Sequence, residues 1–185
     1  MKTLVFVTQN KNKLADAQKL LPGFVIEHVD FDVPEIQSLD PKEIIAHKLS
    51  YAYGKIGKPC FVMDSSLSLA CLNGMPGSFI KWWFEKTVGA EKTCAIATLF
   101  GERGITWTNM LGYFDGHDTH YLEETLKGTL PETPRGTDGY HWDIIFIPEG
   151  EQETFAEMGF ERKQAYAPTK KLLHRLREIA MDTNI

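Results

Sequence analysis

An apolar run that ends abruptly in an acidic residue and two serines is the feature that most constrains how this chain folds. Residues 61–63 are apolar, and Asp64, Ser65 and Ser66 follow them directly. A buried strand that stops in this way brings a reactive side chain to the carboxyl edge of a sheet. Asp64 is therefore the central catalytic candidate. By spacing alone, an ordinary strand followed by an Asp-Ser turn fits equally well.

Composition indicates one intracellular domain. With 185 residues, of which 43% are hydrophobic, the chain can bury one good core, and we expect a single domain over residues 1–185 with two lobes. The net charge of −5 argues against a nucleic-acid partner. We expect no membrane partner, because no run approaches the roughly 20 apolar residues of a membrane span. The three cysteines lack zinc-ligand spacing, which favours reduced thiols and a cytoplasmic location.

Strand-like and helix-like segments alternate along the chain. This order predicts an α/β fold with a mixed twisted sheet and flanking helices. The expected strands are 4–7, 24–33, 61–63, 106–114, 120–127 and 144–147, and the expected helices are 14–21, 41–57, 79–88, 91–100 and one from about 168.

A polar turn follows the first expected strand. Thr8, Asn10, Lys11 and Lys13 lie between the end of that strand and the start of a helix. Outward-pointing backbone N–H groups, the helix dipole and the charge of Lys13 suit an anion there. A solvated loop is the competing interpretation, and composition alone favours it.

Two carboxylates and several lysines suggest a metal-assisted phosphate site. Glu35 and Asp64 lie at separate loop ends and offer the hard oxygen ligands that Mg²⁺ prefers together with substrate phosphates. Lys48 falls within the apolar stripe of its helix, where it either extends to solvent or reaches a ligand. If the four lysines of different elements converge on one cleft, they would form a polyphosphate site; these are Lys11, Lys13, Lys48 and Lys81. The residues alone thus suggest a magnesium-dependent enzyme acting on a nucleotide.

The segment from 134 to 143 is a glycine-punctuated loop that carries aromatic and charged residues. Loops held by a rigid strand are where ligand contacts concentrate. Tyr140 and Trp142 either pack in the core or present a ring to a base.

Eight short motifs occur in the order seen in the inosine triphosphate pyrophosphatase family, also called the Ham1 family. The chain resembles this family from residue 4 to about residue 173, and several ordered motifs are far more specific than any one of them. The motifs are residues 8–13, 34–37, 62–65, 73–77, 81–82, 134–136, 142–143 and 154–158.

The resemblance implies an elongated α/β fold with two lobes around a central cleft, usually as a homodimer. It also implies an enzyme that uses Mg²⁺ to hydrolyse inosine, deoxyinosine and xanthosine triphosphates. The products would be the monophosphate and pyrophosphate, so that deaminated purines are cleared from the nucleotide pool.

Site roles carried over from the family fall into three groups. Asp64, Lys13 and Lys48 would be catalytic, with Glu35 and Asp64 also binding the metal. The phosphates would be held by Thr8, Asn10, Lys13 and Lys48, with Ser65 and Lys81 also on the substrate. The base site would comprise Tyr140, His141, Trp142, Asp143 and Lys163.

The chain departs from the family at positions that face ligands. Ala167, Pro168 and Thr169 replace a Ser-His-Arg segment whose donors help to recognise the 6-oxo group of the purine. Met63 replaces an acidic residue, and Gln9 replaces a glycine. These changes predict a divergent member with an altered base preference. A catalytically weak nucleotide-binding or regulatory protein of the same fold is the alternative, and ribo- and deoxyribonucleotides both remain open.

Overall fold

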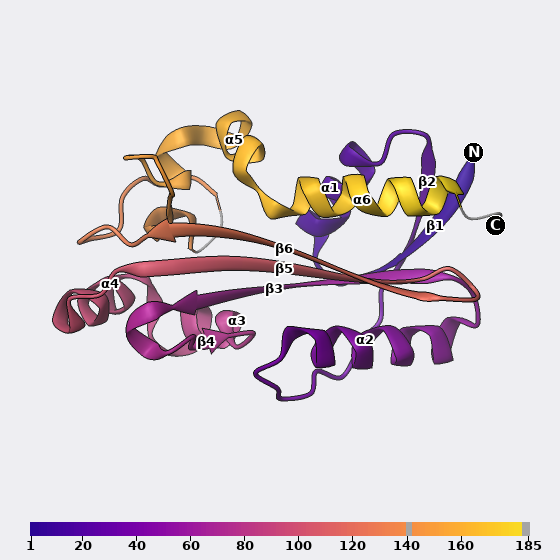
Figure 1. Cartoon of the computed structure of the whole chain (residues 1–185), viewed down its shortest axis with the longest axis horizontal. Coiled ribbons are helices and arrows are strands. Elements are labelled where there is room, and N and C mark those ends of the chain that lie inside the picture. The colour runs from indigo at the N-terminus through magenta and orange to yellow at the C-terminus, as the bar shows by residue number, and fades with distance from the viewer. Residues whose placement is uncertain (140–141, 183–185) are drawn as a thin grey trace. The chain divides into compact units, whose positions relative to one another are not determined.

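The computed structural model describes residues 1–139 and 142–182, apart from the side chain of Phe160. Within these residues the chain forms a mixed seven-stranded sheet with the order β2-β1-β3-β5-β6-β7, and β4 pairs with β3. Helices flank this sheet (Figure 1). The α/β class predicted from the sequence is confirmed.

The first strand is paired in parallel on both sides. β1 (Lys2–Val7) runs parallel to β2 (Phe24–Val29) from the pair Lys2↔Phe24 to the pair Val7↔Val29. On its other side it pairs in parallel with β3 (Cys60–Leu69) through Phe6↔Phe61. The carboxyl ends of these three strands therefore lie at the same edge of the sheet.

The chain divides into two compact units, and the first comprises residues 1–64, 109–124 and 169–185. It contains β1, β2, α1 (Lys11–Leu20), α2 (Pro41–Ile56), α6 (Pro168–Asp182) and parts of the long strands β3, β5 (Gly104–Phe114) and β6 (Thr119–Thr129). In Figure 1, α1 and α6 lie on one face of the sheet in this unit and α2 lies on the other.

Alternate residues of β1 enter two different cores of the first unit. Leu4 and Phe6 pack in a cluster with residues of α1 and α6, whereas Val5 and Val7 pack in a cluster with residues of α2. Successive side chains of a strand point to opposite faces, so a strand covered on both faces is apolar throughout. This explains why residues 4–7 are all apolar.

The second unit comprises residues 65–108 and 125–168. Its core contains three neighbouring rings: Phe146 stacks on Phe155 with centroids 5.0 Å apart, and Trp107 meets both edge-on. Besides parts of β3, β5 and β6, its elements are η1 (Ala70–Leu72), β4 (Pro76–Gly77), α3 (Ile80–Trp82), η2 (Trp83–Thr87), α4 (Gly89–Phe100), η3 (Asp143–Ile145), β7 (Ile147–Pro148) and α5 (Phe155–Tyr166).

Three local predictions are corrected. The expected strand at 144–147 is wrong over most of its length, because Asp143–Ile145 forms a 3₁₀ turn and only Ile147 and Pro148 pair with β6. The expected helix at 79–88 is a short α-helix continued by a π-helix. The extended stretch after Phe24 ends as a strand at Val29 instead of continuing to Val33.

Candidate active site

Helix α2 places a lysine inside the first unit. The Asp40 carboxylate accepts a hydrogen bond from the backbone N–H of Lys42 at 2.8 Å, and Pro41 occupies the first turn, so the predicted start of the helix is confirmed. The sequence from Asp40 to Glu43 is typical of a capping box, but the Glu43 carboxylate accepts a hydrogen bond from the Ser38 hydroxyl instead. Two turns along the helix, Lys48 is only 8% exposed.

Lys48 joins the two predicted carboxylates. Its Nζ lies 2.6 Å from Glu35 Oε1 and 3.0 Å from Asp64 Oδ2. The alternative in which Lys48 extends to solvent is therefore wrong in this structure. β3 continues through Asp64 to Leu69, so the expectations that the strand ends before Asp64 and that Asp64 lies at a loop end are wrong. The Asp64 side chain is 23% exposed within this strand, whereas the Glu35 side chain is 63% exposed in the loop before α2.

Lys13 approaches the same aspartate from helix α1. Its Nζ donates to the backbone carbonyl of Met63 at 3.2 Å and lies 3.7 Å from Asp64 Oδ1. The structure thus brings together Lys13, Glu35, Lys48 and Asp64 from four different segments of the first unit, all of which were predicted from the sequence.

The turn before α1 is held by its own side chains. Asn10 Oδ1 accepts hydrogen bonds from the backbone N–H groups of Asn12 and Lys13, at 3.0 and 3.1 Å, and so caps the helix. Thr8 Oγ1 accepts from the backbone N–H of Asn10 at 3.1 Å. The predicted position between a strand end and a helix N-terminus is confirmed, and in this structure the two side chains shape the loop.

The surroundings of Lys13 and Lys48 shift the pKa values of the two side chains in opposite directions. Burial lowers the pKa of Lys13, and the attraction of Asp64 only partly offsets it. Burial also acts on Lys48, but the charge of Asp64 and the hydrogen bond to Glu35 outweigh it, so the pKa of Lys48 is raised. Lys48 is consequently a firmly charged ammonium between two carboxylates.

The donor set fits a magnesium ion that is shared with a substrate. Glu35 and Asp64 are hard oxygen donors that both contact the same ammonium group, that of Lys48. Within residues 1–139 and 142–182 no group of three or more His, Cys, Asp or Glu side chains is arranged to hold a metal. Mg²⁺ usually takes one or two carboxylates and completes its shell with phosphates and water, so two carboxylates suffice.

A second group of predicted residues meets within the second unit. Lys163 of α5 forms an ion pair with Asp143, whose side chain is 0% exposed. The Lys163 ammonium also lies over two rings, 5.8 Å from the centroid of Trp107 and 5.5 Å from that of Phe155. Trp142 packs near Trp107, with centroids 6.4 Å apart, which agrees with the core-packing interpretation of this residue.

Arg135 and Thr154 hold the glycine-punctuated loop, and the sequence interpretation gave neither of them a role. The Thr154 hydroxyl donates to the carbonyl of Arg135 at 2.9 Å, and Arg135 Nη2 donates to the carbonyl of Gln152. Thr154 also forms a reciprocal capping box with Glu157 at the start of α5. The Thr-x-x-Glu spacing was the signal that could have predicted both this helix and its contact with the loop.

Four predicted residues remain. Lys81 is an exposed residue of α3 in the second unit, and Ser65 follows Asp64 in β3. Tyr140 and His141 lie outside the described residues. The roles assigned to these four residues stay predictions, as do those of the other site residues.

The positions that depart from the family pattern are mostly buried. Ala167 is 4% exposed and belongs to the core of the second unit, and Thr169 accepts a hydrogen bond from the buried Asn109 amide at 2.6 Å. Met63 packs in the core beside α1 and α6. Gln9 is exposed. In this structure the Ala167 and Thr169 side chains therefore pack within the protein.

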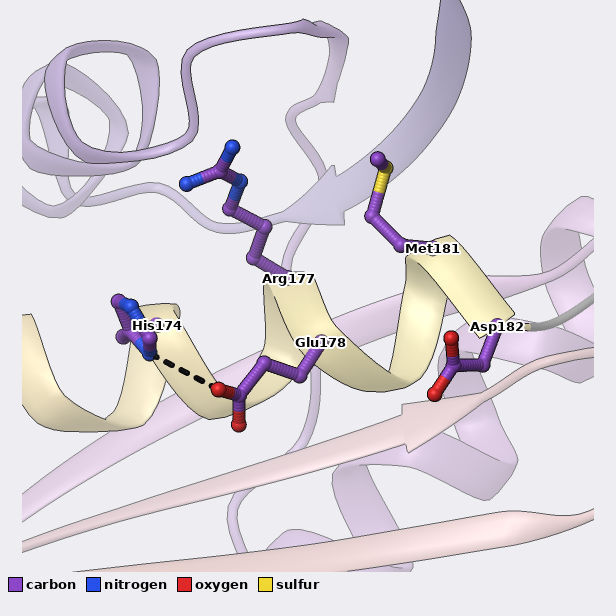
Figure 2. Close-up of a pocket in the computed structure, with 5 residues that line it drawn as sticks. All are labelled: His174, Arg177, Glu178, Met181 and Asp182. Atoms are coloured by element: carbon purple, nitrogen blue, oxygen red, sulfur yellow. Dashed lines mark ion pairs between the residues drawn. The ribbon is translucent and has the colours of Figure 1, made fainter.

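A surface hollow of about 600 Å³ lies along α6 in the first unit. Figure 2 shows the five residues that line it, with His174 paired to Glu178 at 3.5 Å; they are His174, Arg177, Glu178, Met181 and Asp182. None of them belongs to the predicted site, so the candidate site rests on the lysine–carboxylate cluster.

Comparison with known proteins identifies the family. The model of the Ham1 family matches residues 4–179. This chain belongs to the Ham1 family. Its relatives include a dITP/XTP pyrophosphatase of Methanopyrus kandleri, 37% identical over 95% of this chain and 94% of the relative. An inosine triphosphate pyrophosphatase of Kluyveromyces lactis is 34% identical over 98% of this chain and 97% of the relative.

Solved Ham1 structures share the fold. A HAM1 protein from Coxiella burnetii superposes with a TM-score of 0.84 at 25% identity, covering 99% of this chain and 100% of that one. The Ham1 protein of Staphylococcus aureus superposes with a TM-score of 0.80 at 21% identity, covering 97% of this chain and 98% of that one. Among the described residues of the present Ham1 chain, no helix is both long and apolar enough to cross a membrane.

Proposed function

We propose that this Ham1 protein is a hydrolase that converts deaminated or modified purine nucleoside triphosphates to the monophosphate and pyrophosphate, using Mg²⁺. The cluster of Lys13, Glu35, Lys48 and Asp64 is the observation that carries the proposal. Relatives that are similar over nearly the whole chain are named as inosine triphosphate and dITP/XTP pyrophosphatases, which supports the reaction class. The protein would clear such nucleotides from the pool.

Each residue of the cluster would have a distinct task. Attack of water on the α-phosphorus and departure of pyrophosphate concentrate negative charge on the phosphate oxygens, and Lys13 and Lys48 would neutralise that charge. Asp64 would orient the water and accept its proton. Glu35 and Asp64 would hold Mg²⁺, which when bound lowers the pKa of coordinated water and screens phosphate charge. No covalent nucleophile is required.

We infer an altered base preference from the residues that replace the family's Ser-His-Arg segment. The family's Ser-His-Arg donors are replaced by Ala167, Pro168 and Thr169, and two of these side chains pack inside the protein. Selection between a carbonyl and an amino group depends on buried donors that go unpaired with the wrong base. Discrimination between 6-oxo and 6-amino purines should therefore be weaker here than in relatives that keep the His and Arg donors of this segment.

Two further parts of the proposal concern the state of the protein. We expect a homodimer, as the family resemblance implies, and a cytoplasmic location, as the three cysteines without zinc-ligand spacing indicate. Sedimentation velocity would test the first part, and a sedimentation coefficient corresponding to a 21.0 kDa monomer at micromolar concentration would contradict it.

Pyrophosphate release across a panel of nucleotides tests the reaction. Inosine, xanthosine, canonical and modified triphosphates, each as ribo- and deoxyribonucleotide, would be compared with and without Mg²⁺, with Asp64→Asn as the negative control. We expect Mg²⁺-dependent release from deaminated purines and a smaller preference over ATP than a Ham1 relative that keeps the His and Arg donors has under the same conditions. Equal selectivity in the two proteins would contradict the altered preference.

A catalytically weak nucleotide-binding protein is the second candidate. The replaced acidic position, Met63, and the replaced base donors favour it. Its signature would be measurable binding of a nucleotide by calorimetry without pyrophosphate release from any member of the panel, and that result would overturn the enzymatic proposal.

A further inference from the structure

Lys48 occupies the place between the two carboxylates that are proposed to bind the metal. One Nζ atom contacts Glu35 Oε1 at 2.6 Å and Asp64 Oδ2 at 3.0 Å, so both acidic groups are directed at the same point. With a residue exposure of 8%, the Lys48 side chain is largely enclosed by the protein, and the contact is part of the packed structure. The protein's own ammonium is thus a stand-in for an external cation.

The charges of the cluster already balance. Two lysines and two carboxylates sum to zero, and each oxygen of Asp64 has a lysine Nζ within 4 Å. A divalent cation that approaches alone would meet two ammonium groups and would have to displace one of them. Removing one partner from such a pair leaves a partly desolvated charge uncompensated, which is unfavourable unless a new partner replaces it.

The two carboxylates that contact Lys48 differ in how firmly the fold holds them. Asp64 is fixed in β3 and the Lys48 backbone in α2, but the Glu35 side chain is 63% exposed in a segment without helix or strand. Lys13 differs, because its Nζ also donates to the Met63 carbonyl and lies farther from Asp64, at 3.7 Å. Lys48 is therefore the cation whose departure would open the carboxylate pair.

We propose that Lys48 is an exchangeable internal cation, which holds Glu35 and Asp64 together until a triphosphate provides it with a new anionic partner. The inference rests on the proposed function for its ligands. When Lys48 moves to the phosphate oxygens, the two carboxylates become available to Mg²⁺, so triphosphate and metal enter the site together and metal alone binds weakly. The same lysine thereby couples the two ligands.

Titration with Mn²⁺ in the absence of any nucleotide tests this exchange. Mn²⁺ is a paramagnetic substitute for Mg²⁺, so free metal can be followed by electron paramagnetic resonance. We expect Lys48→Met and Lys48→Gln to bind Mn²⁺ at least about tenfold more tightly than the wild type, since close charge pairs commonly couple by more than this factor. Lys55→Met, which removes an exposed lysine of the same helix, is the matched control and should leave the affinity unchanged.

Asp64→Asn in the Lys48→Met background locates the metal. This double variant should lose the gained affinity. Circular dichroism and thermal melting would check that each variant is folded, and the Gln variant provides a polar side chain should the Met variant unfold. Affinity no higher than that of the wild type in a folded Lys48 variant would overturn the exchange, as would an equal gain in Lys55→Met.

The Mn²⁺ affinities can be measured whether or not the protein hydrolyses a nucleotide, so the exchange and the proposed reaction are tested separately. If no nucleotide is hydrolysed but the Lys48 variants bind Mn²⁺ more tightly, the exchange is retained and the proposed reaction fails. If pyrophosphate is released but Mn²⁺ affinity does not respond to Lys48, only the exchange is overturned.

Discussion

The two carboxylate oxygens of Asp64 face two different lysines: Oδ1 lies 3.7 Å from Lys13 Nζ, and Oδ2 lies 3.0 Å from Lys48 Nζ. The lysines come from α1 and α2, so two helices and β3 jointly fix the environment of one acid. An acid held in this way is oriented before any substrate arrives, which is the condition for positioning a water molecule.

Asp64→Asn should abolish most turnover while the protein remains folded. The amide keeps the size of the side chain but can neither accept a proton nor balance the two lysines, so kcat should fall on the order of 10²–10⁴-fold. Pyrophosphate release with the best nucleotide of the panel measures the effect. Glu27→Gln, which removes an exposed partner of Lys58, is the matched control and should retain full activity. A wild-type rate in Asp64→Asn would remove this residue from the mechanism.

Lys163→Met should destabilise the protein substantially. Its ammonium pairs with Asp143, which is 0% exposed, and removing one member of a buried pair costs about 3–5 kcal/mol. Urea unfolding followed by tryptophan fluorescence measures the free energy of unfolding. Lys170→Met, at an exposed position of α6, should change it by less than about 0.5 kcal/mol.

The charge of Asp143 is the reason for that cost, and a double variant tests this. In Lys163→Met/Asp143→Asn this position no longer holds a buried, unpaired carboxylate, so part of the lost stability should return. If the double variant is no more stable than Lys163→Met, the ion pair is not the source of the effect.

Local patterns predicted those parts of the fold whose residues interact with near neighbours in the chain. The four consecutive apolar residues at 4–7 are typical of a strand covered on both faces, and Asp40 followed by Pro41 is typical of a helix start, as β1 and α2 show. Helix α5 was missed although Thr154 and Glu157 form its capping box. The helix packs against β7 and η3, and Phe155 packs with Phe146 and Trp107. These contacts are with other segments of the chain, so the spacing of apolar residues along the helix does not predict them.

For the site, the sequence identified the four charged residues, but it did not decide whether the Lys48 side chain extends to solvent or reaches a ligand. A lysine in an apolar stripe extends to solvent unless a partner is near, and its two partners lie 13 and 16 positions away in the chain. Their convergence depends on how α2 packs beside β3. Arg135 was overlooked for a similar reason, because its partners Gln152 and Glu157 belong to a later segment.

The stability of the β5–β6 hairpin should depend on pH through Asp115. Hydrogen bonds from His120 and from the backbone N–H groups of Asp118 and His117 outweigh burial and lower the pKa of Asp115 from 3.8 to about 2. A lowered folded pKa means that the stabilisation is complete above about pH 4 and is lost as the pH falls toward 2. It should amount to about 1–2 kcal/mol.

Asp115→Asn isolates this contribution, because the amide oxygen can still accept both backbone hydrogen bonds. The wild type should unfold at higher urea concentration than the variant at pH 6, and the difference should shrink as the pH approaches 2. A difference that is constant over this range would show that the carboxylate charge is not involved.

Gly136 is expected to tolerate no side chain, and Gly150 is its matched control. The two glycines have nearly the same left-handed backbone, with φ of +84° and +85°. A Cβ at Gly136 would lie 2.6 Å from the Ala156 Cβ and 3.0 Å from the Glu157 backbone nitrogen, whereas a Cβ at Gly150 would meet nothing within 4 Å. Gly150→Ala should therefore cost only the backbone strain of about 1–2 kcal/mol.

Gly136→Ala should lower the stability by the same backbone strain and by about 1–3 kcal/mol more, because the new methyl group forces the loop away from α5. Since Asp143 belongs to the same loop, the displacement should also raise the KM for the best nucleotide more than it lowers kcat. Urea unfolding and steady-state kinetics of the two variants would measure both effects. Equal losses of stability in Gly136→Ala and Gly150→Ala would mean that the close approach to Ala156 does not hold the loop, and the contacts of Arg135 and Thr154 would then have to fix it alone.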